Sequence, residues 1–101
     1  MLDTHTHTNY LFRMTVLYSI CGLAPMMGPQ PLSATMLPIV VRMASDPVPN
    51  VRFNAAKTLQ QLMPLLEASI VGEHVTPTLT QLTSDSDSDV RYFSTQALQA
   101  F

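Results

Sequence analysis

Hydrophobic positions recur with the period of an α-helix along most of the chain. In the middle of the chain, apolar residues lie three to four positions apart over residues 36–43 and again over residues 51–63. The same two-part pattern returns over residues 74–82 and 90–101, and a single stretch over residues 10–24 precedes both pairs. Apolar residues at this spacing form one side of a helix. The sequence therefore predicts an all-α fold.

Residues that disfavour regular structure separate the two helices of each pair. The segment 45–50 contains two prolines, and the segment 84–89 alternates Ser with Asp. Both patterns are typical of a turn. In the middle pair, we expect Thr35 to cap the first helix, with Pro38 in its first turn, and Asn50 to cap the second.

The chain repeats itself with a period of about 40 residues. The shift that places Arg52 over Arg13 also places Pro64 over Pro25. Helix pairs with this period are typical of α-solenoids of the HEAT or armadillo type. The same shift, applied forward, superposes Pro38 on Pro77, Ser45 on Ser84, Asp46 on Asp85, Val51-Arg52 on Val90-Arg91, and Leu59-Gln60 on Leu98-Gln99.

About two and a half repeats are expected in the stack. Residues 9–25 form the second helix of a partial repeat, and residues 34–66 and 74–101 form two full repeats, after a flexible N-terminal segment 1–8. Solenoids need about three repeats and polar end caps to be stable and soluble, so two and a half repeats predict marginal stability or self-association of the chain. The first helix is apolar on nearly every side, which predicts that another helix covers it. Its apolar residues are Leu11, Phe12, Met14, Val16, Leu17, Tyr18, Ile20, Cys21 and Leu23.

Charge and cysteine content exclude several classes of protein. Five Lys and Arg against seven Asp and Glu give a net charge of −2, which argues against a nucleic-acid binder because phosphate neutralisation needs a basic surface. The single cysteine, Cys21, forms no internal disulfide, and we expect a buried thiol. The uncharged stretch between Arg13 and Arg42 is broken by Gly and Pro, so it predicts no membrane span. We expect a cytoplasmic location, with the nucleus left open as a second one.

A charged pair recurs at the start of each second helix. Asp46 precedes Val51-Arg52, and Asp85 precedes Val90-Arg91, which resembles the Asp…Val-Arg pattern of HEAT repeats. An Arg at this place can reach an Asp in a neighbouring turn and form a charge-assisted hydrogen bond. We therefore expect a structural ladder of Asp46, Arg52, Asp85 and Arg91. The first copy has Arg13, but its Asp position falls on His7, which predicts an altered turn.

The sequence also resembles a particular HEAT family, the structural A subunits of protein phosphatase 2A. The resemblance covers roughly residues 9–101 and departs from the family over residues 28–33 and 68–74. It implies a non-enzymatic scaffold without a cofactor, similar to the last two and a half of fifteen repeats. The segments that carry it are Asn9-Tyr10-Leu11, Arg13-Met14-Thr15, Met36-Leu37-Pro38, Asp46-Pro47-Val48, Asn50-Val51-Arg52-Phe53-Asn54, Ala56-Lys57, Asp89-Val90-Arg91-Tyr92-Phe93 and Gln96-Ala97-Leu98.

This resemblance also implies a partner. In the family, the catalytic subunit of the phosphatase binds the C-terminal repeats, whereas the regulatory subunit binds the N-terminal repeats, mainly through turns within repeats. We expect the catalytic subunit to bind here and the regulatory subunit not to bind. A diverged or truncated remnant, acting as a competitor or without function, is the alternative. The expected partner-binding residues are Asp46, Pro47, Asn50, Asn54, Asp87, Asp89 and Tyr92.

Two motifs indicate metal chemistry on first inspection. The segment Asp3-Thr4-His5-Thr6-His7 resembles the opening of metal-dependent hydrolase barrels, where two alternate His side chains bind one metal. Such a barrel needs ~250 residues, so a hydrolase fragment is a remote alternative. Asp85, Asp87 and Asp89 have the spacing of a calcium loop, but Val90 and Gln96 stand where that loop needs Gly and Glu.

The serines of the second turn are a separate candidate. Ser84, Ser86 and Ser88 alternate with acidic residues, and this pattern leaves open their phosphorylation by an acid-directed kinase.

Overall fold

The computed structural model describes residues 9–100, which are helical along most of their length and contain no strand. The all-α prediction is therefore confirmed. A single helix comes first, and two helix pairs follow it. The helices are α2 (Tyr10–Leu23), α3 (Pro29–Pro31), α4 (Leu37–Met43), α5 (Pro49–Leu62), α6 (Ala68–Ile70), α7 (Thr76–Leu82) and α8 (Ser88–Gln99), with π-helical turns over Leu32–Met36 and Val71–Val75 and 3-10 turns over Ala24–Met26 and Met63–Leu65.

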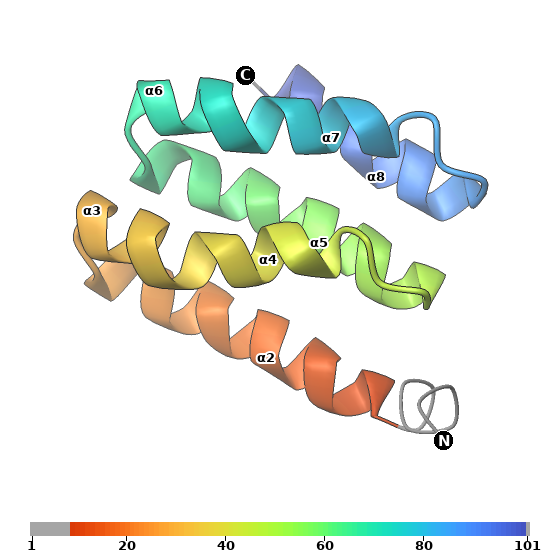
Figure 1. Cartoon of the computed structure of the whole chain (residues 1–101), viewed down its shortest axis with the longest axis horizontal. Helices are drawn as coiled ribbons and strands as arrows, with labels where there is room; N and C mark the ends of the chain where they lie inside the picture. Colours follow the sequence, from red (N-terminus) through yellow and green to blue (C-terminus); the bar gives the residue numbers. More distant parts are fainter. Residues whose placement is uncertain (1–8, 101) are drawn as a thin grey trace.

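The helices stack in two layers, as the solenoid prediction requires (Figure 1). One layer holds the first helices of the two pairs, α3–α4 and α6–α7, and the other holds α2, α5 and α8. Helix α5 is central, because it contacts α2, α8 and its own partner α4. The turns that join α4 to α5 and α7 to α8 lie at one edge of the stack, and the connections between pairs lie at the opposite edge (Figure 1).

Both first helices begin earlier than the sequence predicts. The first starts at Pro29 and the second at Ala68, and each runs through a π-helical turn into α4 or α7. Thr35 caps nothing: it lies inside the helix, and its Oγ1 donates a hydrogen bond to the Pro31 carbonyl at 2.6 Å. In the segment 28–33, where the chain departs from the family, the helix begins at Pro29 after the N-cap Gly28, because proline is tolerated in the first turn, where no N–H is needed.

Proline also explains the π-helical turns. Pro38 and Pro77 lie in the first turns of α4 and α7, directly after the turns over Leu32–Met36 and Val71–Val75. A proline inside a helix has no N–H to donate, and its ring crowds the carbonyl four residues earlier. The wider turn before each proline lets the helix continue. The two π-helical turns occupy equivalent positions in the two helix pairs, so the irregularity belongs to the repeat.

The second helices also start before the expected residues. Helix α5 begins at Pro49, so Asn50 lies in its first turn and is not the N-cap. Proline is pre-organised for the first helical position, which moves the start of the helix to the residue after Val48. Helix α8 has Asp87 as its N-cap, with a side chain that accepts hydrogen bonds from the backbone N–H groups of Asp89 and Val90.

One apolar core runs between the two layers. Its fully buried side chains include Leu17 of α2, Leu59 and Leu62 of α5, and Leu79 of α7. Cys21 is only half-buried, which corrects the expectation of a buried thiol, and its Sγ lies 3.6 Å from the Thr58 hydroxyl. Within residues 9–100, each helix is too short or too polar to cross a bilayer.

Truncating the core at its centre should weaken the whole stack. Leu59 is fully buried on the helix that contacts both neighbours, so Leu59→Ala should cost about 3 kcal/mol of unfolding free energy. Thermal denaturation followed by circular dichroism should show a melting temperature lower by about 10 to 20 °C. The exposed Met26→Ala is the control, and an equal shift in both variants would contradict this assignment of the core.

Candidate functional site

The two turns at the shared edge are built alike. In the first, the Asp46 carboxylate accepts a hydrogen bond from the Val48 N–H at 2.9 Å. In the second, the Asp85 carboxylate accepts one from the Asp87 N–H, also at 2.9 Å. An Asp that bonds the backbone two residues on closes a tight turn without help from another element. Each turn therefore has a shape set by its own sequence.

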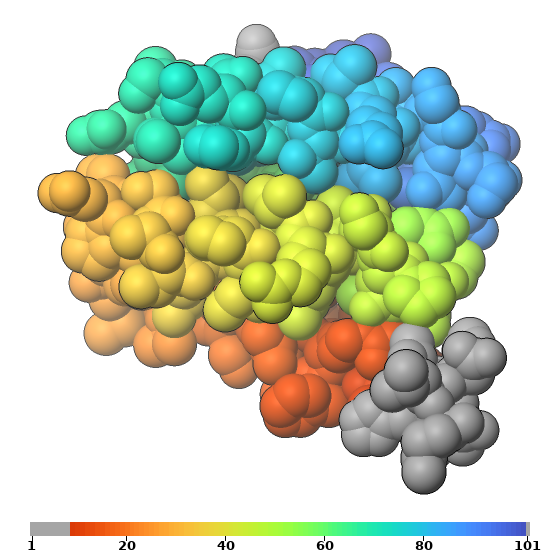
Figure 2. Space-filling view, viewed as in Figure 1, coloured from red at the N-terminus to blue at the C-terminus, as the bar shows by residue number. Residues whose placement is uncertain are grey.

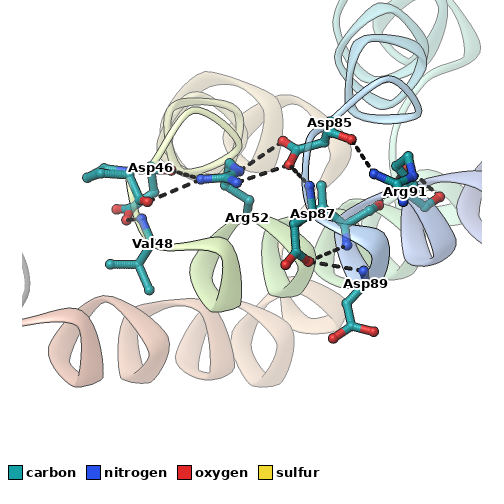
Figure 3. Close-up of polar contacts among 10 residues, drawn as sticks. Asp46, Val48, Arg52, Asp85, Asp87, Asp89 and Arg91 are labelled. Atoms are coloured by element: carbon teal, nitrogen blue, oxygen red, sulfur yellow. Dashed lines mark hydrogen bonds and ion pairs between the residues drawn. The ribbon is translucent and has the colours of Figure 1, made fainter.

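Arginines at the starts of the second helices join each turn to the next (Figure 3). The Arg52 guanidinium binds the Asp85 carboxylate through two hydrogen bonds, Nε to Oδ2 at 2.9 Å and Nη2 to Oδ1 at 3.0 Å, while its Nη1 donates to the Asp46 carbonyl at 2.8 Å. Arg13 of α2 binds the Asp46 carboxylate in the same two-pronged way, with Nη2 to Oδ1 at 2.9 Å. The ladder thus runs through three helices and both turns.

The last arginine of the ladder makes only half of these contacts. Arg91 donates from Nη1 to the carbonyl of Asp85 at 2.8 Å, as Arg52 does to Asp46. Within residues 9–100, however, no carboxylate pairs with it. Arg91 is exposed and belongs to α8, the last helix of the stack.

The environment of Asp85 favours its charged form. Burial raises the pKa of this carboxyl, but hydrogen bonds from Arg52 and the Asp87 N–H, together with the charges of Arg52 and Arg91, outweigh burial. The pKa of Asp85 is therefore held below its usual range. The rung between the two helix pairs is an ion pair at neutral pH.

The residues expected to bind a partner divide into two groups. Asp46 is 9% exposed and Asn54 is 8% exposed, and both are occupied within the chain. The Asn54 amide donates to the carbonyl and to the side-chain oxygen of Asn50, both at 2.8 Å. Asp87 is half-buried and caps α8. The exposed members are Pro47, Asn50, Asp89 and Tyr92.

An aromatic cluster beside these turns was not predicted from the sequence. The rings of Phe53 and Phe93 stack at 5.3 Å between centroids, and Tyr92 meets Phe93 edge-on at 5.2 Å. The Lys57 ammonium lies 5.0 Å from the Phe93 centroid, within the range of a cation–π contact. The internal repeat aligns Phe53 with Tyr92, which is the signal that could have drawn attention to the cluster. Tyr92 joins this cluster through its edge-on contact with Phe93.

A hollow adjoins the ladder of Arg and Asp side chains. It measures about 440 Å³ and lies between α4 and α7, with Arg52 and Asp85 in its wall. Figure 2 shows the face on which α4 (yellow) and α7 (blue) lie side by side. Its remaining lining residues are Val41, Ala44, Ser45, Thr78, Gln81, Leu82 and Ser84.

Comparison with known proteins assigns the repeat. The HEAT repeat family matches residues 4–99, nearly the whole chain. The chain belongs to the HEAT-repeat family. Its HEAT repeats are similar to those of the PP2A 65 kDa regulatory subunit of Drosophila melanogaster, 55% identical over 56 residues, which is 55% of this chain and 10% of that protein.

Two further relatives extend the comparison. The PP2A regulatory A subunit of Saccharomyces cerevisiae is 32% identical over 102 residues, which cover 95% of this chain and 16% of that protein. The human serine/threonine-protein phosphatase 4 regulatory subunit 1 is 42% identical over 64 residues, 58% of this chain and 7% of that protein. The resemblance to the A subunits is therefore confirmed, and the HEAT chain spans only a small part of the length of each of these relatives.

The structure bears differently on the two metal-like motifs and on the serines of the second turn. Two of the three carboxylates of the calcium-like spacing already have partners, since Asp85 binds Arg52 and Asp87 caps α8. Asp3, His5 and His7 lie outside the described residues, as does the expected flexible segment 1–8. Ser84 and Ser86 are exposed in the second turn, and Ser88 is exposed at the first position of α8. Their phosphorylation stays a prediction.

Removing the central rung should destabilise the HEAT stack. The side chains of Arg52 and Asp85 are 14% and 12% exposed. Removing one partner of a largely buried pair leaves the other charge buried without a counter-ion. Arg52→Ala should lower the free energy of unfolding by about 3 kcal/mol, measured by urea denaturation. Arg42→Ala, an exposed arginine on α4, is the matched control. In a double-mutant cycle, Arg52→Ala and Asp85→Ala should together cost less than their sum, and full additivity would contradict the pairing.

Acid should weaken the same rung. The folded pKa of Asp85 lies below its ordinary value of 3.8. The stability that the ionised carboxylate contributes is therefore complete above that value and is lost as the pH falls through the lower folded pKa. Urea denaturation between neutral pH and pH ~3 should therefore show a steeper loss of stability for the unaltered chain than for Asp85→Asn. The exposed Asp89→Asn removes the same charge outside the rung and should keep the steep profile. Equal slopes for Asp85→Asn and the unaltered chain would disprove the assignment.

Proposed function

We propose that this chain is a non-enzymatic scaffold segment whose turn edge binds the catalytic subunit of a PP2A-type phosphatase. The observation that carries the proposal is the alignment of two turns on one edge, joined by the Arg52–Asp85 rung. The similarity to regulatory subunits of protein phosphatase 2A supports a scaffold role. The mechanism is positional, because a rigid stack places neighbouring turns about one helix-packing distance apart, ~10 Å.

The chemistry of the edge suits a specific contact. Asn50 offers an amide at the first turn, and Asp89 and Tyr92 offer a carboxylate and a ring at the second, all exposed. Tyr92 contacts Phe93 edge-on and is 57% exposed, so its ring is available to a partner. Exposed Tyr side chains are frequent anchors of protein interfaces. Asp46, Asn54 and Asp87 contribute by fixing the backbone that presents these groups.

Binding to the purified phosphatase 2A catalytic subunit tests the edge. Tyr92→Ala should weaken the complex by about 10- to 30-fold, the effect typical of an interface anchor, and Asn50→Ala should add to it. Biolayer interferometry with the immobilised catalytic subunit measures both affinities. Met26→Ala, an exposed apolar residue after α2 and away from the turns, is the control.

Two results would reject this binding surface. One is an unchanged affinity for Tyr92→Ala together with Asn50→Ala. The other is an equal loss of affinity in the control. Circular dichroism of each variant separates loss of contact from loss of fold.

The phosphatase 4 relative points to a second candidate partner. A regulatory subunit of that enzyme matches 58% of the chain at 42% identity. The same assay with the phosphatase 4 catalytic subunit in place of the 2A subunit ranks the two partners. Tighter binding to the phosphatase 4 subunit would move the proposal to that enzyme while leaving the edge in place.

A further inference from the structure

Two hollows follow one another between the first helices of the two pairs. One is the hollow of about 440 Å³ beside the Arg52–Asp85 rung, and the second measures about 330 Å³. Val41 of α4 lines both, so the two hollows form one groove along this helix. The exposed lining of the second hollow is largely apolar, with basic side chains beside it. Its residues are Ser33, Leu37, Pro38, Val41, Arg42 and His74.

This groove lies within the stack and not at one of its ends. One wall is the first helix of the middle pair, residues 29–43, and the other is the first helix of the last pair, residues 68–82. Figure 2 shows the face on which these two helices lie side by side. In a solenoid each repeat contacts only its neighbours along the stack. Repeats added at either end therefore lengthen the molecule and leave the groove open.

The groove is long enough for an extended peptide. Positions 33, 37, 41 and 45, which line it, recur every four residues and so lie on one side of the helix. At 1.5 Å per residue this side spans about 18 Å, the length of about five residues of an extended chain. Toward the turn the lining becomes polar, where Ser45 and Gln81 offer a hydroxyl and an amide that can bond a peptide backbone.

Arg42 gives the apolar hollow a charge that the chain itself does not use. Its side chain is exposed, and it forms no ion pair with the described residues. His74, the other basic group, has the Glu73 carboxylate 3.9 Å from its Nε2, so Arg42 is the cation available to a partner. The remaining cations have partners: Arg13 binds Asp46, Arg52 binds Asp85, Arg91 bonds the Asp85 carbonyl and Lys57 lies over Phe93.

An unused guanidinium beside apolar surface selects the chemistry of the occupant. A guanidinium is always charged and binds a carboxylate through paired hydrogen bonds. The apolar lining at Leu37 and Val41 favours an apolar side chain next to that carboxylate. The length of the groove and its polar end favour a peptide over a compact small molecule.

We infer that the groove between the two first helices binds an extended peptide segment of another protein, with an apolar side chain against Leu37 and Val41 and a carboxylate on Arg42. The proposed phosphatase contact uses Asn50 and Tyr92, which belong to the second helices α5 and α8. The two surfaces lie on different elements, so either proposal can fail without the other.

Fluorescence polarisation with labelled peptides tests the groove. The probe is a seven-residue peptide of Gly and Ser with a central Leu and an Asp on each side of it. One companion peptide has Lys in place of both Asp residues, and another has Ser in place of Leu. The probe should bind about five- to tenfold more tightly than either companion, because each companion loses one of the two contacts. Equal affinity of the three peptides, or no saturable binding up to about 1 mM, overturns the inference.

Reversing the charge of Arg42 has a signature that loss of fold cannot imitate. Arg42→Glu should bind the Lys peptide more tightly than the Asp probe, and Arg42→Gln should bind the two equally. Lys57→Glu makes the same change of charge at an exposed position of α5 outside both hollows, and it should keep the preference for Asp. A preference for Asp that survives in Arg42→Glu and Arg42→Gln overturns the inference. Binding of the phosphatase catalytic subunit should be equal in Arg42→Glu and the unaltered chain, because the turn edge is intact.

Discussion

The hydrogen bonds of the Arg52 guanidinium fix the position of one helix pair relative to the other. The guanidinium holds the carbonyl of Asp46 in its own pair and the carboxylate of Asp85 in the next one. Apolar packing between α5 and α8 is broad and has no direction along the helix. A two-pronged ion pair is directional, so it selects one register among the many that hydrophobic contact permits. Arg13 binds the Asp46 carboxylate in the same two-pronged way, so the same kind of ion pair also fixes the register between α2 and the first helix pair.

The use of the buried polar groups within the chain explains why the turn edge is suited to binding. The polar atoms that shape the turns are used internally: Asp46 and Asp85 by arginines, Asp87 by the start of α8, and Asn54 by Asn50. What remains outward is a small set of side chains on a backbone that is already fixed. A partner that meets such a surface loses little free energy in ordering it.

The sequence predicted the layers better than the ends of the elements. Helical spacing and the internal repeat indicated the fold and the Arg–Asp motif, because both recur and reinforce one another. The starts of the first helices were missed because Pro29 resembles a break and Pro38 resembles a residue of the first turn, whereas Pro29 lies at the helix start and Pro38 follows a π-helical turn. The burial of Asn54 and the stacking of Phe53 on Phe93 depend on contacts between helices, which periodicity in one helix does not report.

Within residues 9–100, Arg91 bonds the carbonyl of its own turn and pairs with no carboxylate, so the ladder has a direction along the stack. Arg13 and Arg52 each reach from the start of one second helix to the turn that comes later in the chain, so both ion pairs point toward the C-terminal end. A repeat therefore joins from that side by supplying one aspartate in its turn and brings its own arginine for the next. The two ends of the ladder therefore differ, because one presents an arginine and the other an aspartate. This difference sets the order in which repeats can be added or exchanged by design.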